Sequence, residues 1–315
     1  MFRGVFHLRV ALLPVLAALL MLAASAGARD HAGTKVTIVI SGDQAPYATA
    51  ADAVDRTLTR NSLTATRVSN AELTNERLSS VAPGEVLIAV GTEAALRLHK
   101  EAPEGVRVVY CMSSDSRELS AGRKSTRGVV TDVPIAEQVK LLTQALPKAR
   151  RVGVIYRSSG ARSAALKAQL EGALPDGMSV VAIDVDHETS VADAIRQLIA
   201  SQPDVLWTAA DSSVFNSTTV QALLKEAIAA KVPVFGFSTQ LVRAGAIVGV
   251  GVRPEDQGDR AGALAVEAAS AAAAGDAPIR EGPKVRVAVN TLVAERLGFE
   301  LPDDLLGKAD DTFGK

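Results

Sequence analysis

Six short clusters of hydroxyl, amide and acidic side chains each follow an apolar run of the chain. The clusters are Ser41–Gln44, Gly91–Glu93, Ser113–Asp115, Arg157–Ser159, Asp211–Ser213 and Ser238–Gln240. Their side chains donate and accept hydrogen bonds, and Asp211 adds a charge that suits a ligand cation. Turns and helix N-caps also select Ser, Thr and Asp, so local structure alone explains any single member. Six clusters in equivalent positions favour a polar binding site. The candidate ligand-binding residues are Ser41, Gln44, Thr92, Ser113, Arg157, Ser158, Ser159, Asp211, Ser212 and Ser238.

Catalytic and metal-binding patterns are missing from the sequence. The stretch Gly236-Phe-Ser-Thr-Gln240 begins like a nucleophile elbow but lacks the closing glycine, and no phosphate-binding loop of the P-loop type occurs. Outside the N-terminal segment, His31, His99 and His187 stand alone without ligand spacing. We therefore expect a binding protein, not an enzyme, with no catalytic residue, no metal and no cofactor.

Composition excludes further classes of function. The chain has 34 basic and 35 acidic residues, so no basic excess exists to attract nucleic acid. The single cysteine, Cys111, cannot form an internal disulfide, and it ends the apolar run 106–111. That position predicts a buried small side chain instead of a reactive thiol. Aromatic residues make up 3% of the chain, which argues against a binding site built as an aromatic cage.

The N-terminus has the pattern of a secretory signal. Two arginines precede or border the apolar run Val10–Ala24, and small residues at 24–28 form two overlapping cleavage sites. An uncleaved membrane anchor is the alternative. We expect residues 1–28 to be a signal peptide, the mature chain to begin at Gly27 or Arg29, and the protein to act in the periplasm.

The first half of the mature chain alternates short apolar runs with helical patterns. The expected strands are Lys35–Ile40, Leu63–Val68, Glu85–Val90 and Val106–Cys111, and the expected helices are Ala48–Thr59, Ala71–Ser80 and Thr92–Glu101. Near-continuous apolar runs are typical of parallel strands covered on both faces. This block therefore predicts a doubly wound parallel sheet.

A second block of the same order follows the junction 127–134. Its expected strands are Arg151–Tyr156, Ser179–Asp184, Asp204–Thr208 and Pro233–Phe237, and its helices are Ala161–Glu171, Val191–Ser201 and Thr218–Ala230. A strand at 245–252, a helix at 255–274 and a strand at 284–289 come after it. Ligands of open α/β sheets bind beyond the carboxyl ends of the strands, where the polar clusters fall. The fold class is therefore α/β, with two doubly wound parallel-sheet lobes joined by a hinge, and the facing edges would enclose a ligand.

Several stretches in order resemble one family. They are Pro134-Ile-Ala-Glu-Gln138, Leu146–Tyr156, Asp204–Asp211, Lys231–Gly236, Gly245-Ala-Ile and Val289–Gly298. Together they look like the substrate-binding proteins of ABC transporters, of the type that includes tryptophan- and tyrosine-binding members. The resemblance covers nearly all of the mature chain and implies the type I periplasmic-binding-protein fold.

That fold implies three crossings between the lobes. We place them near Thr131–Pro134, Thr239–Ala244 and Ala277–Lys284. On this reading, residues 29–132 form the first lobe and 245–276 return to it. Residues 133–244 form the second lobe and 277–315 return to it.

The family also implies roles for particular residues. The residue that matches Asp211 typically holds the amino group of the ligand, and hydroxyls that match Thr92, Ser158 and Ser159 typically lie around its carboxylate. This chain has Arg157 where the family often has Asn, and Ser238 and Thr239 follow Phe237 where an acid is common. These departures predict a more anionic ligand than a plain amino acid.

The function expected is that of a periplasmic receptor. It would close on an amino-acid-like zwitterion or small anion and deliver it, as a monomer, to an ABC permease in the inner membrane. The alternative is a periplasmic ligand-sensing protein that docks on a membrane receptor.

Overall fold

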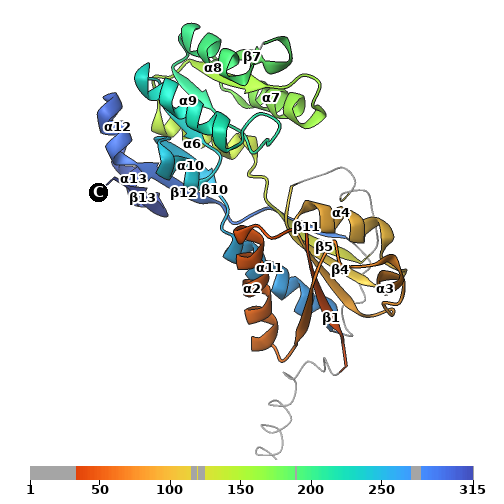
Figure 1. Ribbon diagram of the computed structural model, residues 1–315. Helices are drawn as coiled ribbons and strands as arrows, with labels where there is room; N and C mark the ends of the chain where they lie inside the picture. The colour runs from red at the N-terminus through yellow and green to blue at the C-terminus, as the bar shows by residue number, and fades with distance from the viewer. Residues whose placement is uncertain (1–32, 115–118, 120–124, 189, 271–277, 315) are drawn as a thin grey trace, which may run out of the picture.

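The computed structural model describes residues 33–114, 119, 125–188, 190–270 and 278–314, which form two α/β lobes (Figure 1). The strand order is β11-β5-β4-β3-β1-β2 in the first sheet and β13-β12-β10-β9-β8-β6-β7 in the second. Every pairing described is parallel except that of β10 with β12. The prediction of two parallel-sheet α/β lobes is confirmed.

The first lobe surrounds a buried parallel sheet. Its strands are β1 (Val36–Ile40), β2 (Ala65–Ser69), β3 (Val86–Val90), β4 (Arg107–Ser113), β5 (Thr126–Val130) and β11 (Ile279–Glu281). Its helices are α2 (Ala45–Arg60), α3 (Asn75–Ser79), α4 (Thr92–Glu101) and α11 (Pro254–Ala269). All five residues of β3 are buried, as its apolar sequence predicts.

Helices α2 and α11 lie side by side on one face of this sheet (Figure 1). Their backbones come so close that a Cβ added at Gly258 would stand 2.1 Å from the carbonyl oxygen of Ala50. Glycine at 258 is therefore required for this contact. The packing fixes α11 to the first lobe, far along the chain from the rest of that lobe.

The second lobe has seven strands and its own helices. The strands are β6 (Arg151–Tyr156), β7 (Ser179–Asp184), β8 (Val205–Trp207), β9 (Val234–Gly236), β10 (Val248–Gly251), β12 (Arg286–Asn290) and β13 (Asp311–Phe313). The helices are α6 (Ile135–Ala145), α7 (Ala161–Ala173), the 3-10 turn η1 (Val185–His187), α8 (Val191–Ala200), α9 (Ser217–Ala229), α10 (Thr239–Ala244), α12 (Thr291–Leu297) and α13 (Asp303–Lys308). Buried apolar side chains form a separate core on each face.

The chain crosses between the lobes in three segments, 131–134, 252–253 and 282–285. Two boundaries differ from the prediction. Strand β10 pairs with β9 and β12, so residues 245–251 belong to the second lobe and not the first, and the second crossing follows β10. Strand β11 pairs with β5, so part of the stretch from 277 onward belongs to the first lobe. A buried apolar strand fits either sheet equally well, and its sequence therefore does not tell which sheet takes it.

Strand β5 occupies part of the stretch 127–134, for which the sequence predicts a junction between the lobes. Its sequence, Thr-Arg-Gly-Val-Val, is too short and too mixed to signal a strand. Cys111 is fully buried, as expected, and burial raises the pKa of its thiol to about 12. Among the helices that the structure describes, none is both long enough and apolar enough to cross a bilayer. The predicted signal peptide and Asp115 lie outside the described residues.

Candidate ligand-binding site

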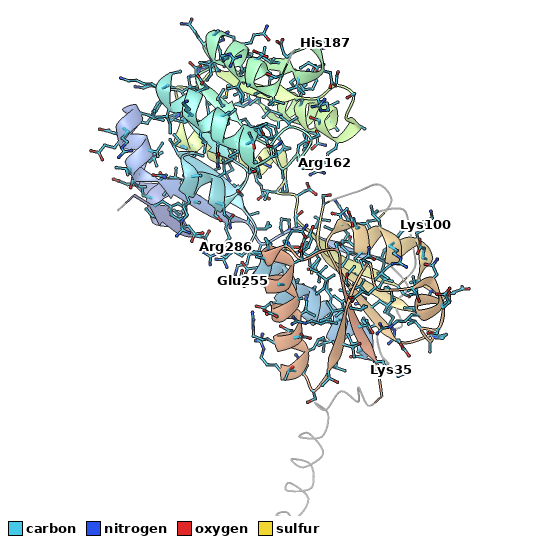
Figure 2. All side chains as sticks on the ribbon, viewed as in Figure 1. Lys35, Lys100, Arg162, His187, Glu255 and Arg286 are labelled. Atoms are coloured by element: carbon cyan, nitrogen blue, oxygen red, sulfur yellow. The ribbon has the colours of Figure 1, made fainter. Side chains whose placement is uncertain are left out.

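Topology places the polar clusters at one edge of each sheet. Strand β5 ends at Val130, immediately before the first crossing, and β10 ends at Gly251, immediately before the second. The other cluster-bearing strands run parallel to these two, so their carboxyl ends share the same edges. We call these edges the strand-end edges. Lys35, at the amino end of β1, lies at the opposite end of the first lobe from Glu255 and Arg286, which mark the joined region (Figure 2). Each strand-end edge therefore lies on the side toward the other lobe.

In the first lobe, the ends of β1, β3 and β4 bring three predicted residues together. The Ser41 hydroxyl accepts a hydrogen bond from the Ala94 N–H in the first turn of α4, at 2.9 Å. The Thr92 hydroxyl accepts one from the Ser114 N–H at 3.4 Å and lies 3.5 Å from the Ser113 hydroxyl. Gln44 is exposed at the start of α2. The Ser41 oxygen caps a helix, whereas the half-buried Thr92 hydroxyl accepts these bonds and keeps its own O–H to donate to a ligand.

A buried glutamine shapes the end of β4. Pairing with β5 shifts register between Tyr110 and Ser113, and Met112 has a φ of +53°, which is unusual for a residue with a side chain. Gln257 on α11 is 1% exposed. Its side-chain oxygen accepts from the Met112 N–H, and its amide donates to the Val130 carbonyl, both at 3.1 Å. Gln257 therefore holds the bulge that places Ser113 and also the last residue before the first crossing.

A second buried glutamine, in the other lobe, also binds the backbone of the first crossing. The amide of Gln138 on α6 donates to the Val133 carbonyl at 2.9 Å, and its oxygen accepts from the Trp207 indole N–H at 3.1 Å. Trp207 is 1% exposed and lies on β8, the strand that leads to Asp211. The first crossing is thus held at Val130 by one lobe and at Val133 by the other.

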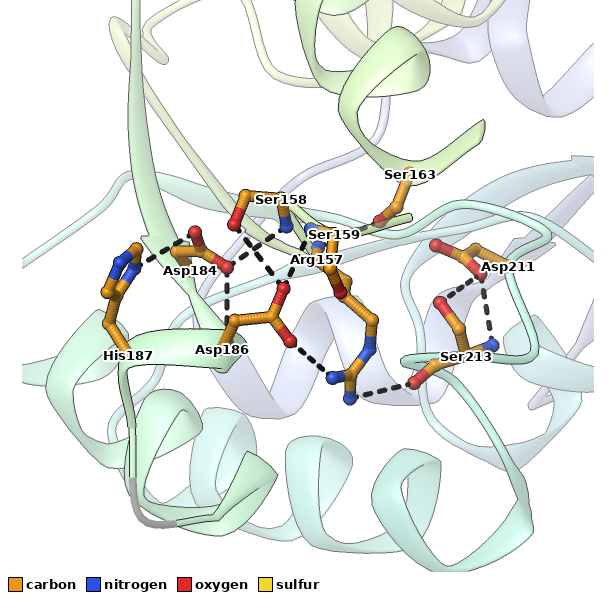
Figure 3. Close-up of polar contacts among 9 residues, drawn as sticks. All are labelled: Arg157, Ser158, Ser159, Ser163, Asp184, Asp186, His187, Asp211 and Ser213. Carbon is orange, nitrogen blue, oxygen red and sulfur yellow. Dashed lines mark hydrogen bonds and ion pairs between the residues drawn. The ribbon is translucent and has the colours of Figure 1, made fainter. Parts of the chain in front are cut away.

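In the second lobe, a carboxylate of the protein occupies the end of β6. Asp186, in η1, accepts from the Arg157 guanidinium at 2.5 Å, the Ser159 N–H at 2.8 Å and the Ser158 hydroxyl at 3.3 Å (Figure 3). Asp184 accepts from the Ser158 N–H at 3.1 Å. Sequence reasoning missed both acids, although Asp184-Val-Asp186 directly follows the apolar part of β7.

The charge of Arg157 is matched within the protein. Hydrogen bonds from Ser159, together with the positive charge of Arg157, lower the pKa of Asp186 below its ordinary value. Asp186 is therefore an anion at neutral pH and forms an ion pair with Arg157. The sequence predicted a more anionic ligand partly because Arg157 adds a positive charge. Since Asp186 already matches that charge, Arg157 no longer supports this prediction.

Asp211 lies at the end of β8 and is 8% exposed. Its Oδ1 accepts from the N–H and the hydroxyl of Ser213, at 3.0 and 2.7 Å (Figure 3). Within the described residues, Oδ2 makes no hydrogen bond. The N-cap of α9 is Asn216, which forms a capping box with Thr219, so Asp211 does not cap that helix. One oxygen of a nearly buried carboxylate thus remains free to bind.

Arg157 also braces the turn that carries Asp211. Its second terminal nitrogen donates to the Ser213 carbonyl at 3.3 Å. Ser212 is exposed beside it. At the end of β9, the Ser238 oxygen accepts from the Leu241 N–H at 3.2 Å and caps α10, as a local interpretation of Ser238 predicts. The predicted residues therefore lie at the two strand-end edges, but they differ in how many of their polar atoms remain available to a ligand.

Ion pairs connect the lobes at the other two crossings. Arg286 of β12 binds Asp256 of α11 through two nitrogens, at 2.9 and 3.1 Å, and also Asp310 at 2.8 Å. Arg253, within the second crossing, binds Asp311 at 2.7 Å. Two surface hollows, of about 620 and 540 Å³, lie at the amino ends of β1 and β2 and beside the third crossing. They contain none of the predicted residues.

Two parallel-sheet lobes, joined by three segments and with polar strand ends next to the joints, define a two-lobed binding protein of the periplasmic-binding-protein fold. The chain belongs to the ABC transporter substrate binding protein family, whose family model matches residues 64–313.

One curated relative matches part of the chain. The chain is 30% identical over 158 residues to the tyrosine-binding protein of Clostridioides difficile (strain R20291). That match spans 49% of this chain and 43% of the relative, so less than half of the relative's length is covered.

Solved structures share the fold over most of the chain. The ABC domain in complex with L-Trp from Streptococcus pneumonia has a TM-score of 0.67 at 18% identity, and the match covers 89% of this chain and 99% of that one. A ligand-free, open substrate-binding protein with adhesive properties from Clostridium difficile has a TM-score of 0.72 at 20% identity, covering 90% and 100%.

Proposed function

We propose that this protein is an exported receptor that closes on an amino-acid-like zwitterion and delivers it to an ABC permease in the membrane. The observation that carries the proposal is the free Oδ2 of Asp211, a nearly buried carboxylate oxygen at a strand-end edge. A nearly buried anion with an open acceptor position favours a cationic partner, and a ligand ammonium supplies both charge and donors.

The first lobe supplies groups for the opposite end of such a ligand. Thr92 opens α4, and the Ser41 hydroxyl already satisfies the N–H of Ala94. The preceding N–H groups of that turn and the Thr92 hydroxyl suit a carboxylate, because a helix N-terminus carries partial positive charge. A carboxylate on the first lobe and an ammonium on the second would give the ligand one contact with each lobe.

Closure follows from this division of contacts. A ligand that touches both lobes stabilises the state in which both are within reach. The three crossings are the natural place for the movement, and the buried bonds of Gln257 and Gln138 restrict bending of the first crossing to the residues between Val130 and Val133. Delivery to a permease would then depend on a surface that the closed form presents.

The test is a ligand screen on the purified mature protein. The twenty standard amino acids, small dicarboxylates and simple sugars are tested for thermal stabilisation, and positive compounds are titrated by calorimetry. We expect stabilisation that grows with concentration for at least one compound with a primary ammonium and a carboxylate. Binding confined to sugars or to acids without an ammonium would refute the proposal. Stimulation of a permease's ATPase by the loaded protein, with membrane-reconstituted transporter, tests delivery.

A further inference from the structure

Three donors around the end of β6 point at one carboxylate that belongs to a different element. Arg157, Ser158 and Ser159 come from the loop after β6, whereas Asp186 comes from the turn after β7. The contacts join a guanidinium, a hydroxyl and a backbone N–H to a single pair of oxygens (Figure 3). Such a set of donors is what a protein uses to hold a carboxylate of a ligand.

The donor set lies next to the candidate ammonium site. Arg157 bonds the Ser213 carbonyl, and Ser213 in turn bonds Oδ1 of Asp211. Because Arg157 and Asp211 both bond Ser213, a ligand whose ammonium meets Oδ2 of Asp211 would lie at the same strand-end edge as Arg157. Asp186 fills the acceptor position at this place, and its side chain is 21% exposed.

We propose that Asp186 is a specificity-determining residue: its carboxylate occupies the position of a second anionic group, so the site takes zwitterions without an additional negative charge. The proposal rests on the proposed function, because it assumes that the ligand binds at Asp211. Asp186 pairs with Arg157 and occupies one of its terminal nitrogens, so a further anion at this place would meet a carboxylate instead of an available guanidinium.

The first experiment needs no amino acid. Asp186→Ala removes the carboxylate and leaves the donors of Arg157, Ser158 and Ser159 without it. Thermal unfolding is measured in sodium acetate and in sodium chloride at equal ionic strength. We expect acetate to raise the melting temperature of the variant above its value in chloride, and the wild type to unfold at the same temperature in both salts.

Two further variants test whether the acetate effect arises from the donors that Asp186 leaves open. Asp176→Ala removes an exposed acid from the loop before β7, outside the strand-end edges, and it is expected to behave like the wild type. The double variant Asp186→Ala/Arg157→Leu is expected to lose the acetate effect. An acetate effect of equal size in the wild type, none in Asp186→Ala, or full survival of the effect in the double variant would overturn the proposal.

The second experiment reads selectivity and uses a milder change. Asp186→Asn retains an acceptor for the Ser159 N–H but removes the charge, so the fold is expected to persist even where alanine is not tolerated. The probes are L-glutamate and L-glutamine, which differ by one negative charge. We expect the ratio of glutamate to glutamine affinity to rise at least about tenfold in the variant, about 1.4 kcal/mol.

The two experiments separate the two ideas. An unchanged glutamate-to-glutamine ratio in Asp186→Asn contradicts the role of Asp186 in selectivity. If no amino acid stabilises the wild type, the proposed function fails instead, while acetate still reports whether Asp186 fills an anion position.

Discussion

The change Asp211→Asn separates a binding role from a structural one. Oδ1 of Asp211 accepts from both the N–H and the hydroxyl of Ser213. These two donors require an oxygen, so the asparagine oxygen takes the place of Oδ1 and its NH2 group takes the place of Oδ2. The turn is retained, and the free energy of unfolding without ligand should change by less than about 1 kcal/mol. The position that faces the ligand changes from a charged acceptor to a neutral donor.

The size of the binding loss follows from that exchange. Unit charges about 3 Å apart interact by about 5.5 kcal/mol at an effective dielectric constant of about 20. Desolvation of both groups offsets part of this energy, and loss of one partner of a desolvated charge pair costs about 2–5 kcal/mol. The amide NH2 also opposes the ammonium. We therefore expect affinity to fall by at least about tenfold, or about 1.4 kcal/mol, with larger losses if the lobes exclude water.

Calorimetric titration of the wild type and Asp211→Asn with the same amino acid measures this loss. Asp176→Asn is the matched control, because it removes an exposed charge from the same lobe away from the strand-end edge. Equal affinities of the wild type and Asp211→Asn would refute the reasoning. So would an equal loss in Asp176→Asn, because the effect would then be one of overall charge.

Four other outcomes are expected. The intact mass of the protein from the cell envelope should correspond to a chain that begins at Gly27 or Arg29, and a mass that includes the whole N-terminus would contradict export with cleavage. Gln257→Leu should lower the unfolding free energy by about 1–3 kcal/mol, measured by urea denaturation, because the partly buried N–H of Met112 and the buried carbonyl of Val130 lose their partner; an unchanged midpoint would rule out this anchoring. The pKa of Asp186 is lower in the folded protein than its ordinary value of 3.8, so the ionised side chain stabilises the fold above about pH 4, and this stability is lost as the pH falls through the folded-state pKa. On acidification below about pH 4, the melting temperature of Asp186→Asn should therefore fall less than that of the wild type. Cys111 should react with a thiol reagent at neutral pH only after unfolding, and rapid labelling of the native protein would show that it is accessible.

Sequence reasoning predicted the parts of the fold that depend on local pattern. The apolar run of β3 and the helical stripe of α8 appear where they were expected. The lobe that contains β10 could not be predicted in the same way. Its apolar residues suit any buried strand, and only pairing with β9 and β12, which depends on the whole chain, decides its sheet.

The candidate site shows the same division. The position of Asp211 at a strand end could be predicted, since it follows an apolar run in a parallel-sheet pattern. The pairing of Arg157 with Asp186 could not, because the two residues follow adjacent strands, β6 and β7, whose pairing is set by tertiary structure. A charge that seems free in the sequence was therefore already matched in the fold.

The central claim is that a ligand brings the two lobes together, and small-angle X-ray scattering of the purified mature protein tests it most directly. The radius of gyration is measured without ligand and with a saturating amount of the amino acid identified by calorimetry, and the same titration is followed by the fluorescence of Trp207, the single tryptophan of the chain. We predict a smaller radius of gyration at saturation, with a half-point that matches the calorimetric affinity. A saturated protein with an unchanged radius of gyration would contradict closure and would confine the site to one lobe.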